Sequence, residues 1–186
     1  VAVLWTLTQK QDLDAIHDYL SHLDGQLEQL SPKVHAANPT VNTILQRVAA
    51  QTQELGIAFR VSALLPESLS IDEGDLCGFL FNLLDNALEA AAKVPHGEII
   101  CSLQIRQQYL SIRCENTYDG TVHTDSAGNL LTTKDDPAEH GFGLMKMRSI
   151  AEKYGSVLDV SYDKNRFTVM TALKLLPEKE SPISSL

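Results

Sequence analysis

The chain has 186 residues, of which 44% are hydrophobic and 21% are charged, a composition typical of a globular domain. The formal net charge of −9 disfavours nucleic acid as a partner, because the average field of the protein repels polyanions. No apolar run approaches the roughly 20 residues of a membrane-spanning helix, so we expect no direct membrane contact from this segment.

The three cysteines, Cys77, Cys101 and Cys114, show no CxxC spacing, which disfavours a zinc site. We interpret them as small buried side chains in a reducing, cytoplasmic compartment. The chain begins at Val1 without a methionine, so we expect it to be part of a longer protein.

Residues 1–36 predict a partial helical hairpin. Residues 1–9 are apolar and are expected to end a helix that begins upstream, and Asp12 is a suitable N-cap for a second helix over 13–30. The apolar residues of this second helix recur at three- and four-residue steps: Leu13, Ile16, Leu20, Leu23, Leu27 and Leu30. The period is close to that of a coiled-coil seam, so we expect a homodimer through these helices.

Residues 37–176 predict a second domain of α+β class. In chain order we expect a helix from Asn38-Pro39 to Gly56, a strand over 57–61 and a strongly apolar helix over 73–93. Two strands follow over 98–106 and 109–115, and then a polar loop over 117–140. The domain ends with a helix over 144–154 and a hairpin of strands over 157–162 and 167–175. Long polar loops are usually functional lids or disordered segments. This order predicts helices on a mixed or antiparallel sheet, and the tail 177–186 is expected to be flexible.

The apolar helix carries three polar residues on one face. Asn82, Asn86 and Glu89 follow each other at four- and three-residue steps. Polar groups on such a helix are costly unless they meet a polar partner, and carboxamide oxygens are suitable ligands for Mg²⁺. A solvent-exposed polar face explains the same pattern, so this motif alone leaves both interpretations open.

Two further motifs flank the polar loop. The Gly141-Phe142-Gly143-Leu144 turn precedes a predicted helix, where glycines and free N–H groups suit a phosphate. The second motif, at the end of a strand, is Glu115-Asn116-Thr117-Tyr118-Asp119-Gly120. A side-chain oxygen there could accept a hydrogen bond from an adenine amino group. Taken alone, each motif is better explained by an ordinary turn.

Taken together, the order of these motifs resembles that of one ATPase superfamily, the GHKL group of gyrase, chaperone, mismatch-repair and histidine kinase ATP domains. FNLLDNALEAA resembles the asparagine box of the kinases, HGFGLMKMRSIAEKYG resembles their second glycine box, and CENTYDG stands where the first glycine box would be. The resemblance covers residues 39–176. More specifically, the chain resembles the quorum-sensing and citrate-sensor-like kinases, which have a short lid. Their Asn-Pro-x-Val-x-x-Ile-Leu pattern matches residues 38–45. The implied fold is a two-layer α/β sandwich, the Bergerat ATP-binding fold, in which helices cover a mixed sheet.

The resemblance implies roles for particular residues. Asn86 would supply a carbonyl oxygen to Mg²⁺, and Asn82 would lie one turn before it, near the phosphates of ATP. Asn116 replaces the adenine-reading aspartate of the family, and Tyr118 replaces its first glycine, so the loop there must differ. The implied phosphate contacts are the backbone of the glycine box and two lysines: Gly141, Gly143, Leu144, Lys134 and Lys146.

Position 82 distinguishes a kinase from a hydrolase within this superfamily. The hydrolytic members carry a glutamate there that activates water, whereas a carboxamide cannot act as a general base. ATP would then be held without efficient hydrolysis until a better-placed nucleophile accepts the phosphoryl group, with positioning and magnesium supplying most of the catalysis.

The phosphoacceptor should be a histidine. His17-Asp18-Tyr19-Leu20-Ser21-His22-Leu23 matches the phosphoacceptor box of the family except at Ser21. Its flanking sequence, however, resembles the second helix of the dimerisation hairpin, which places the acceptor upstream of Val1 and leaves His17 as the alternative.

These observations predict the ATP-binding catalytic region of a sensor histidine kinase. It would pass the γ-phosphoryl group to a histidine and then to a response regulator, at the intracellular end of a membrane-anchored sensor. Two alternatives stay open: an anti-sigma-type serine kinase, and a non-enzymatic phosphotransfer or scaffold protein with a decayed ATP site.

Overall fold

The computed structural model describes residues 36–124, 130–131 and 142–175. The chain divides into two compact units, Val1–Lys33 and Val34–Leu186, and every described residue belongs to the second unit. The helical hairpin predicted over 1–36 and the tail 177–186 therefore lie outside the described residues, apart from Ala36, and the predicted domain boundaries stay a prediction.

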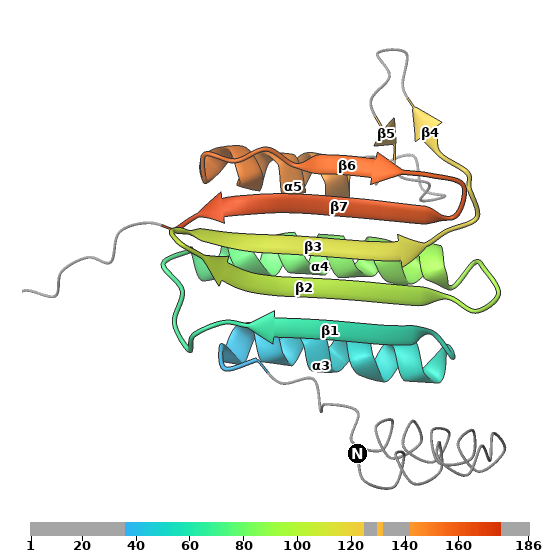
Figure 1. The fold of residues 1–186 in the computed structure, drawn as a ribbon, viewed down its shortest axis with the longest axis horizontal. Coiled ribbons are helices and arrows are strands. Elements are labelled where there is room, and N and C mark those ends of the chain that lie inside the picture. Colours follow the sequence, from blue (N-terminus) through green and yellow to red (C-terminus); the bar gives the residue numbers. More distant parts are fainter. Residues whose placement is uncertain (1–35, 125–129, 132–141, 176–186) are drawn as a thin grey trace, which may run out of the picture. The chain divides into compact units, whose positions relative to one another are not determined.

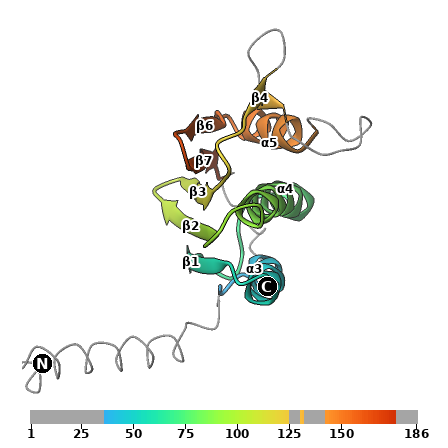
Figure 2. The same ribbon diagram turned by 90° about the vertical axis from the view of Figure 1, so that its right-hand side faces the viewer.

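The second unit is built on one five-stranded mixed sheet. Its strand order is β1-β2-β3-β7-β6, in which β1 is parallel to β2 and all other neighbours are antiparallel (Figure 1). The strands are β1 (Ala58–Leu64), β2 (Glu98–Arg106), β3 (Tyr109–Thr117), β6 (Asp159–Tyr162) and β7 (Arg166–Lys174). Within the described residues, three helices cover one face of this sheet (Figure 2): α3 (Pro39–Glu54), α4 (Glu73–Ala91) and α5 (Phe142–Lys153). The predicted two-layer α+β fold with a mixed sheet is confirmed.

Helix α3 begins and ends where its sequence signals place it. The side chain of Asn38 accepts a hydrogen bond from the Val41 N–H group at 3.0 Å, and Pro39 occupies the first helical turn, both of which favour helix initiation. After the C-cap Leu55, Gly56 adopts a positive φ of 66°, which ends the helix as predicted.

Helix α4 is the central helix of the layer. Asp72 caps its N-terminus by accepting from the Asp75 N–H group at 3.0 Å. The helix ends at Ala91, two residues before the predicted end, because the chain must turn into β2: a Cβ on Gly97 would lie only 2.3 Å from the Ala91 carbonyl oxygen. Its buried face is a continuous apolar stripe of Leu76, Phe79, Leu80, Leu83, Leu84, Ala87 and Ala91.

Alternation along the strands divides the sheet into a core face and an outer face. In β2, Ile99, Cys101 and Leu103 are buried, and the intervening residues are only partly buried, as expected for a sheet with one covered face. The outer face carries ion pairs between strands: Glu98 on β2 contacts Arg60 on the neighbouring β1 at 2.8 Å and Arg166 on β7, beyond β3, at 2.6 Å.

The structure differs from the sequence analysis mainly in the polar segment 117–140. β3 extends to Thr117, and a two-residue strand pair, β4 (His123–Thr124) with β5 (Leu130–Leu131), forms where a loop alone was predicted. Strands this short carry no alternating pattern that could be read from the sequence. β1 runs on to Leu64, beyond the predicted 57–61, because it pairs with β2 along its whole length.

A polar cluster joins the start of α4 to the end of α5. The Tyr154 hydroxyl accepts a hydrogen bond from the Asp72 N–H group and donates one to the Asp75 carboxylate, both at 2.9 Å. Lys153 forms an ion pair with the same carboxylate. Among the helices of the described ranges, none combines the length and hydropathy needed to cross a bilayer.

Candidate functional site

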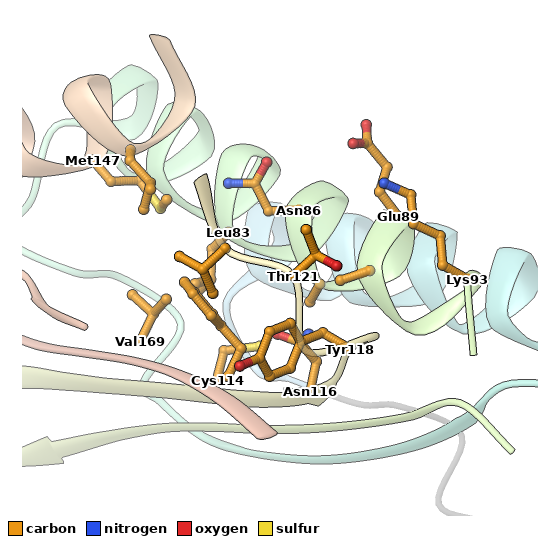
Figure 3. A pocket seen from close by; sticks show the side chains of 15 residues that line it. Leu83, Asn86, Glu89, Lys93, Cys114, Asn116, Tyr118, Thr121, Met147 and Val169 are labelled. Carbon is orange, nitrogen blue, oxygen red and sulfur yellow. The ribbon is translucent and has the colours of Figure 1, made fainter. Parts of the chain in front are cut away.

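A pocket of about 110 Å³ lies between α4, α5 and the β3–β7 end of the sheet (Figure 3). Helix α4 contributes residues at helical spacing: Leu83, Asn86, Ala87, Glu89, Ala90 and Lys93, the last just beyond its end. The sheet and the segment after β3 contribute Cys114, Asn116, Tyr118, Thr121, Val122, Phe167 and Val169, and α5 contributes Leu144 and Met147. The pocket therefore has an apolar floor and a few polar groups, as small-molecule sites usually do.

Gly143 brings the asparagine helix and the glycine turn together. A Cβ built on Gly143 would lie 3.2 Å from Asn82 Oδ1 and 3.4 Å from Asn86 Nδ2. Both carboxamides thus lie directly against the backbone of the first turn of α5. A side chain at this position would press on the Asn82 oxygen, which a glycine avoids, so two motifs far apart in the sequence form one surface.

The two asparagines are held differently. Asn82 Nδ2 donates to the Gly78 carbonyl oxygen at 2.6 Å, one turn earlier on α4. Asn86 lines the pocket itself. Gly78 also makes room for α5, because a Cβ there would lie 3.1 Å from Lys146 Cε and 3.3 Å from Lys146 Nζ. The Lys146 amine is therefore placed beside α4, one turn before Asn82.

Asn116 sits at the base of the pocket, near the end of β3. Its side chain is 4% exposed and its Nδ2 donates to the Thr117 carbonyl oxygen at 2.9 Å. Because the chain engages the amino group, the carboxamide oxygen is the acceptor that Asn116 offers to a ligand.

Tyr118 follows directly and fixes the loop in a way that a glycine could not. Its hydroxyl donates to the Asp163 carbonyl oxygen, and its N–H group donates to the Asn165 carbonyl oxygen at 3.2 Å. Burial raises the pKa of Tyr118, and the nearby Asp163 charge adds to this, so the hydroxyl stays a donor at neutral pH. Gly120, at φ 80°, then passes so close to the β6–β7 turn that a Cβ would lie 3.0 Å from the Lys164 carbonyl oxygen.

Cys114 and Cys101 lie on the core side of the sheet below the pocket. They are directly opposite each other in the β2–β3 register, and both are 1% exposed. A hydrogen bond with Cys101, together with burial, raises the pKa of the Cys114 thiol well above its usual value. Cys114 therefore stays a neutral thiol, in agreement with its interpretation as a small buried side chain.

One family model, described as the GHKL domain, matches residues 71–174, more than half of the chain. The chain belongs to the GHKL domain family. No curated protein sequence matches it at a significant level.

Solved structures of histidine kinases share this GHKL fold. The mycobacterial sensor histidine kinase MprB is 21% identical, with a TM-score of 0.55, over 74% of this chain and 95% of that chain. The histidine kinase AdeS of Acinetobacter baumannii is 17% identical, with a TM-score of 0.54, over 90% and 84%. A histidine kinase from Burkholderia phymatum STM815 is 16% identical, with a TM-score of 0.57, over 95% and 92%. At these identities the likeness concerns the fold.

The predicted site residues lie at different distances from the pocket. Asn86, Asn116 and Leu144 line the pocket, while Asn82 and Gly143 adjoin it. Lys146 lies against Gly78 rather than in the pocket lining. Lys134, Gly141 and His17 lie outside the described residues, so their predicted roles stay predictions.

Most of the other residues that line the pocket could not be predicted from the sequence. In the sequence, Tyr118 stands out only as a departure from the family pattern, and nothing singles out Phe167, Met147 or Lys93 as site residues. One signal was available: residues 114, 116 and 118 alternate, so strand periodicity predicts that their side chains share a face. Phe167 gives no such signal, because its place depends on β7 pairing with β3, where it lies opposite Asn116.

Proposed function

We propose that this GHKL domain is the ATP-binding catalytic region of a sensor histidine kinase. It transfers the γ-phosphoryl group of ATP to a histidine, and a response regulator then takes the group. The observation that carries this proposal is the contact of Gly143 with Asn82 and Asn86. It joins a pair of carboxamides to the start of a helix, a place suited to phosphates.

The base end of ATP fits the opposite part of the pocket. The Asn116 carboxamide oxygen accepts a hydrogen bond from the amino group of adenine, and apolar side chains such as Leu83, Met147 and Val169 line the same pocket. Asn86 lies on the α4 wall (Figure 3), next to Gly143 at the start of α5. A mainly apolar pocket with carboxamide groups suits a nucleotide, which has a flat, weakly polar base and charged phosphates.

The donor groups present also fit a magnesium ion. The Asn86 carboxamide oxygen is a hard ligand, and Mg²⁺ usually completes its shell with water and phosphate oxygens. When bound, the ion would neutralise charge on the transferring phosphoryl group. Lys146, and Lys134 beyond the described residues, would add positive charge near the phosphates.

Asn82 accounts for transfer rather than hydrolysis. Its amino group is fixed on the Gly78 carbonyl oxygen, and a carboxamide has no useful basicity. Water is therefore not activated at this position. The nucleophile must therefore be another group. We assign this role to a histidine upstream of Val1, with His17 as the alternative.

The remaining parts of the proposal concern the assembly. The leucine stripe of residues 13–30 forms a homodimer, and the domain works at the cytoplasmic end of a membrane-anchored sensor. A second candidate, a non-enzymatic phosphotransfer or scaffold protein with a decayed ATP site, is favoured by one observation. Asn116 and Tyr118 both depart from the first glycine box, and Tyr118 fills part of the pocket wall.

Calorimetric titration with Mg·ATP separates the two candidates. The kinase region should bind Mg·ATP with a dissociation constant in the micromolar to submillimolar range, roughly 6 to 8 kcal/mol of binding free energy. Absence of binding up to millimolar concentration would contradict the kinase proposal and leave the scaffold.

Asn86→Ala tests the proposed metal ligand. In a full-length protein this change should reduce autophosphorylation by at least roughly a hundredfold, because the ion that orients the phosphates is lost, while thermal unfolding stays cooperative. Gln53→Ala, which removes an exposed carboxamide from α3, is the matched control and should keep full activity. Retained activity in Asn86→Ala would show that the ligand is assigned to the wrong residue.

A further inference from the structure

Tyr118 is the aromatic side chain closest in sequence to the carboxamide that faces the base. It is 7% exposed, lines the pocket, and follows Asn116 by two residues (Figure 3). Across the pocket, α4 presents the small side chains of Ala87 and Ala90. A large ring on one wall and two methyl groups on the other leave a space suited to a flat ligand.

The Tyr118 ring is held from two sides. Its hydroxyl is fixed on the Asp163 carbonyl oxygen, and its ring packs against the Phe167 ring in a T-shaped arrangement, with 5.9 Å between the centroids and an interplanar angle of 69°. Phe167 in turn stacks on Tyr162 at 6.2 Å and 8°. Aromatic pairs in these geometries are favourable beyond their apolar burial. The ring is therefore a preorganised wall, which keeps the cost of ordering on binding small.

We propose that Tyr118 is the base-selecting residue of this pocket, and that its ring, next to the Asn116 oxygen, selects an aminopurine over a pyrimidine. The inference rests on the proposed nucleotide site and adds a specificity determinant to it. A bicyclic purine covers more of the Tyr118 ring than a pyrimidine does, and its exocyclic amino group meets the Asn116 acceptor. Contact with the ring offsets the charge that is lost where an asparagine replaces an aspartate.

Base selectivity tests this role. If Tyr118 were purely structural, replacing it would change the stability of the domain and leave the selectivity unchanged. Dissociation constants for Mg·ATP and Mg·CTP are measured on the wild type, Tyr118→Leu and Tyr118→Phe. Tyr118→Leu keeps an apolar side chain but has no aromatic face, so Mg·ATP should bind roughly tenfold more weakly, with Mg·CTP changing less than twofold. Tyr118→Phe keeps the ring and should keep the selectivity, although it loses the hydrogen bond to Asp163.

The outcomes separate this inference from the proposed function. A wild type that binds neither nucleotide overturns both. A wild type that prefers Mg·ATP, with the same preference in Tyr118→Leu, overturns only the role of Tyr118. Loss of selectivity in a folded Tyr118→Phe overturns the assignment to the ring. If Tyr118→Leu does not fold, nuclear Overhauser contacts in the wild type decide: contacts from the Tyr118 ring to the H2 and H8 protons of adenine support the inference, and their absence in a saturated complex contradicts it.

Discussion

Gly143 leaves little room for a side chain, because a Cβ there would make a tight contact of 3.2 Å with Asn82 Oδ1 and lie 3.4 Å from Asn86 Nδ2. We expect Gly143→Ala to weaken Mg·ATP binding by roughly tenfold, since the Asn82 carboxamide must shift and the added methyl group occupies space beside Asn86. The fold should not suffer, because alanine favours a helix over glycine by about 0.5–1 kcal/mol. Calorimetry and thermal unfolding test the two expectations together. Ser149→Ala, an exposed position on the same helix, is the control, and equal affinity in both variants would show that the asparagines adapt freely.

Asn116 is not equivalent to an aspartate that has merely lost its charge. Its amino group donates to the Thr117 carbonyl oxygen within a site that is 4% exposed. In Asn116→Asp a carboxylate oxygen would face that carbonyl, so the ligand-free domain should lose about 1–3 kcal/mol of unfolding free energy. Urea unfolding at pH 7 measures this loss. An unchanged or raised stability would mean that the carboxamide is oriented the other way round.

At the scale of secondary-structure elements, one cluster fixes how α5 sits on α4. The Asp75 carboxylate receives a hydrogen bond from Tyr154 and an ion pair from Lys153. Its bond with Lys153 lowers the pKa of Asp75 below 3.8, and the same bond raises the pKa of Lys153 above 10.5. The cluster therefore connects the helix that carries Asn86 to the helix that carries Gly143.

These two shifts define a pH dependence. A lowered carboxyl pKa stabilises the fold above the unfolded-state value near 3.8 and is lost as the pH falls through the folded-state value. A raised lysine pKa stabilises below 10.5 and is lost as the pH rises past the folded-state value. Asp75→Asn should therefore have a lower Tm than the wild type from pH 5 to 9, and the difference should shrink below pH 3.8. A difference that stays constant into strong acid would contradict the ion pair.

The sequence predicted the helices of the described part within a few residues, because each has a cap and a continuous apolar stripe. Asn38 and Gly56 mark the ends of α3, and the stripe from Leu76 to Ala91 marks α4. Strand ends were less accurate, since pairing sets them: β1 extends to Leu64 opposite Gln104. The pair β4–β5 was missed because two residues cannot show a period.

At the scale of the whole molecule, every described strand and helix lies after residue 33. The chain divides there, and Ala36 already belongs to the core of the second unit. We expect a fragment of residues 34–186 to unfold cooperatively and to bind Mg·ATP within about twofold of the whole chain. Calorimetry on both proteins tests this. A fragment that folds but no longer binds nucleotide would show that the N-terminal unit completes the site.

The candidate site shows where sequence reasoning stops at this scale. Asn86, Asn116 and Gly143 could be named because motif order pointed to them. The walls could not, because they require that β7 lies beside β3 and that α5 packs on α4. Tyr118 illustrates the difference: the sequence showed only that a glycine was missing, whereas the structure shows what its ring contacts.

The position of β7 between β3 and β6 has a consequence for synthesis of the protein. β7 is the last described strand along the chain, yet it pairs with all nine residues of β3. Until β7 leaves the ribosome, the edge of β3 that faces away from β2 is unpaired, and such edges favour association with other chains. Phe167 and Val169 also reach the pocket only with this strand. A nascent chain therefore lacks part of the pocket wall until β7 has been synthesised, so a ligand of this pocket cannot stabilise the emerging domain before that point.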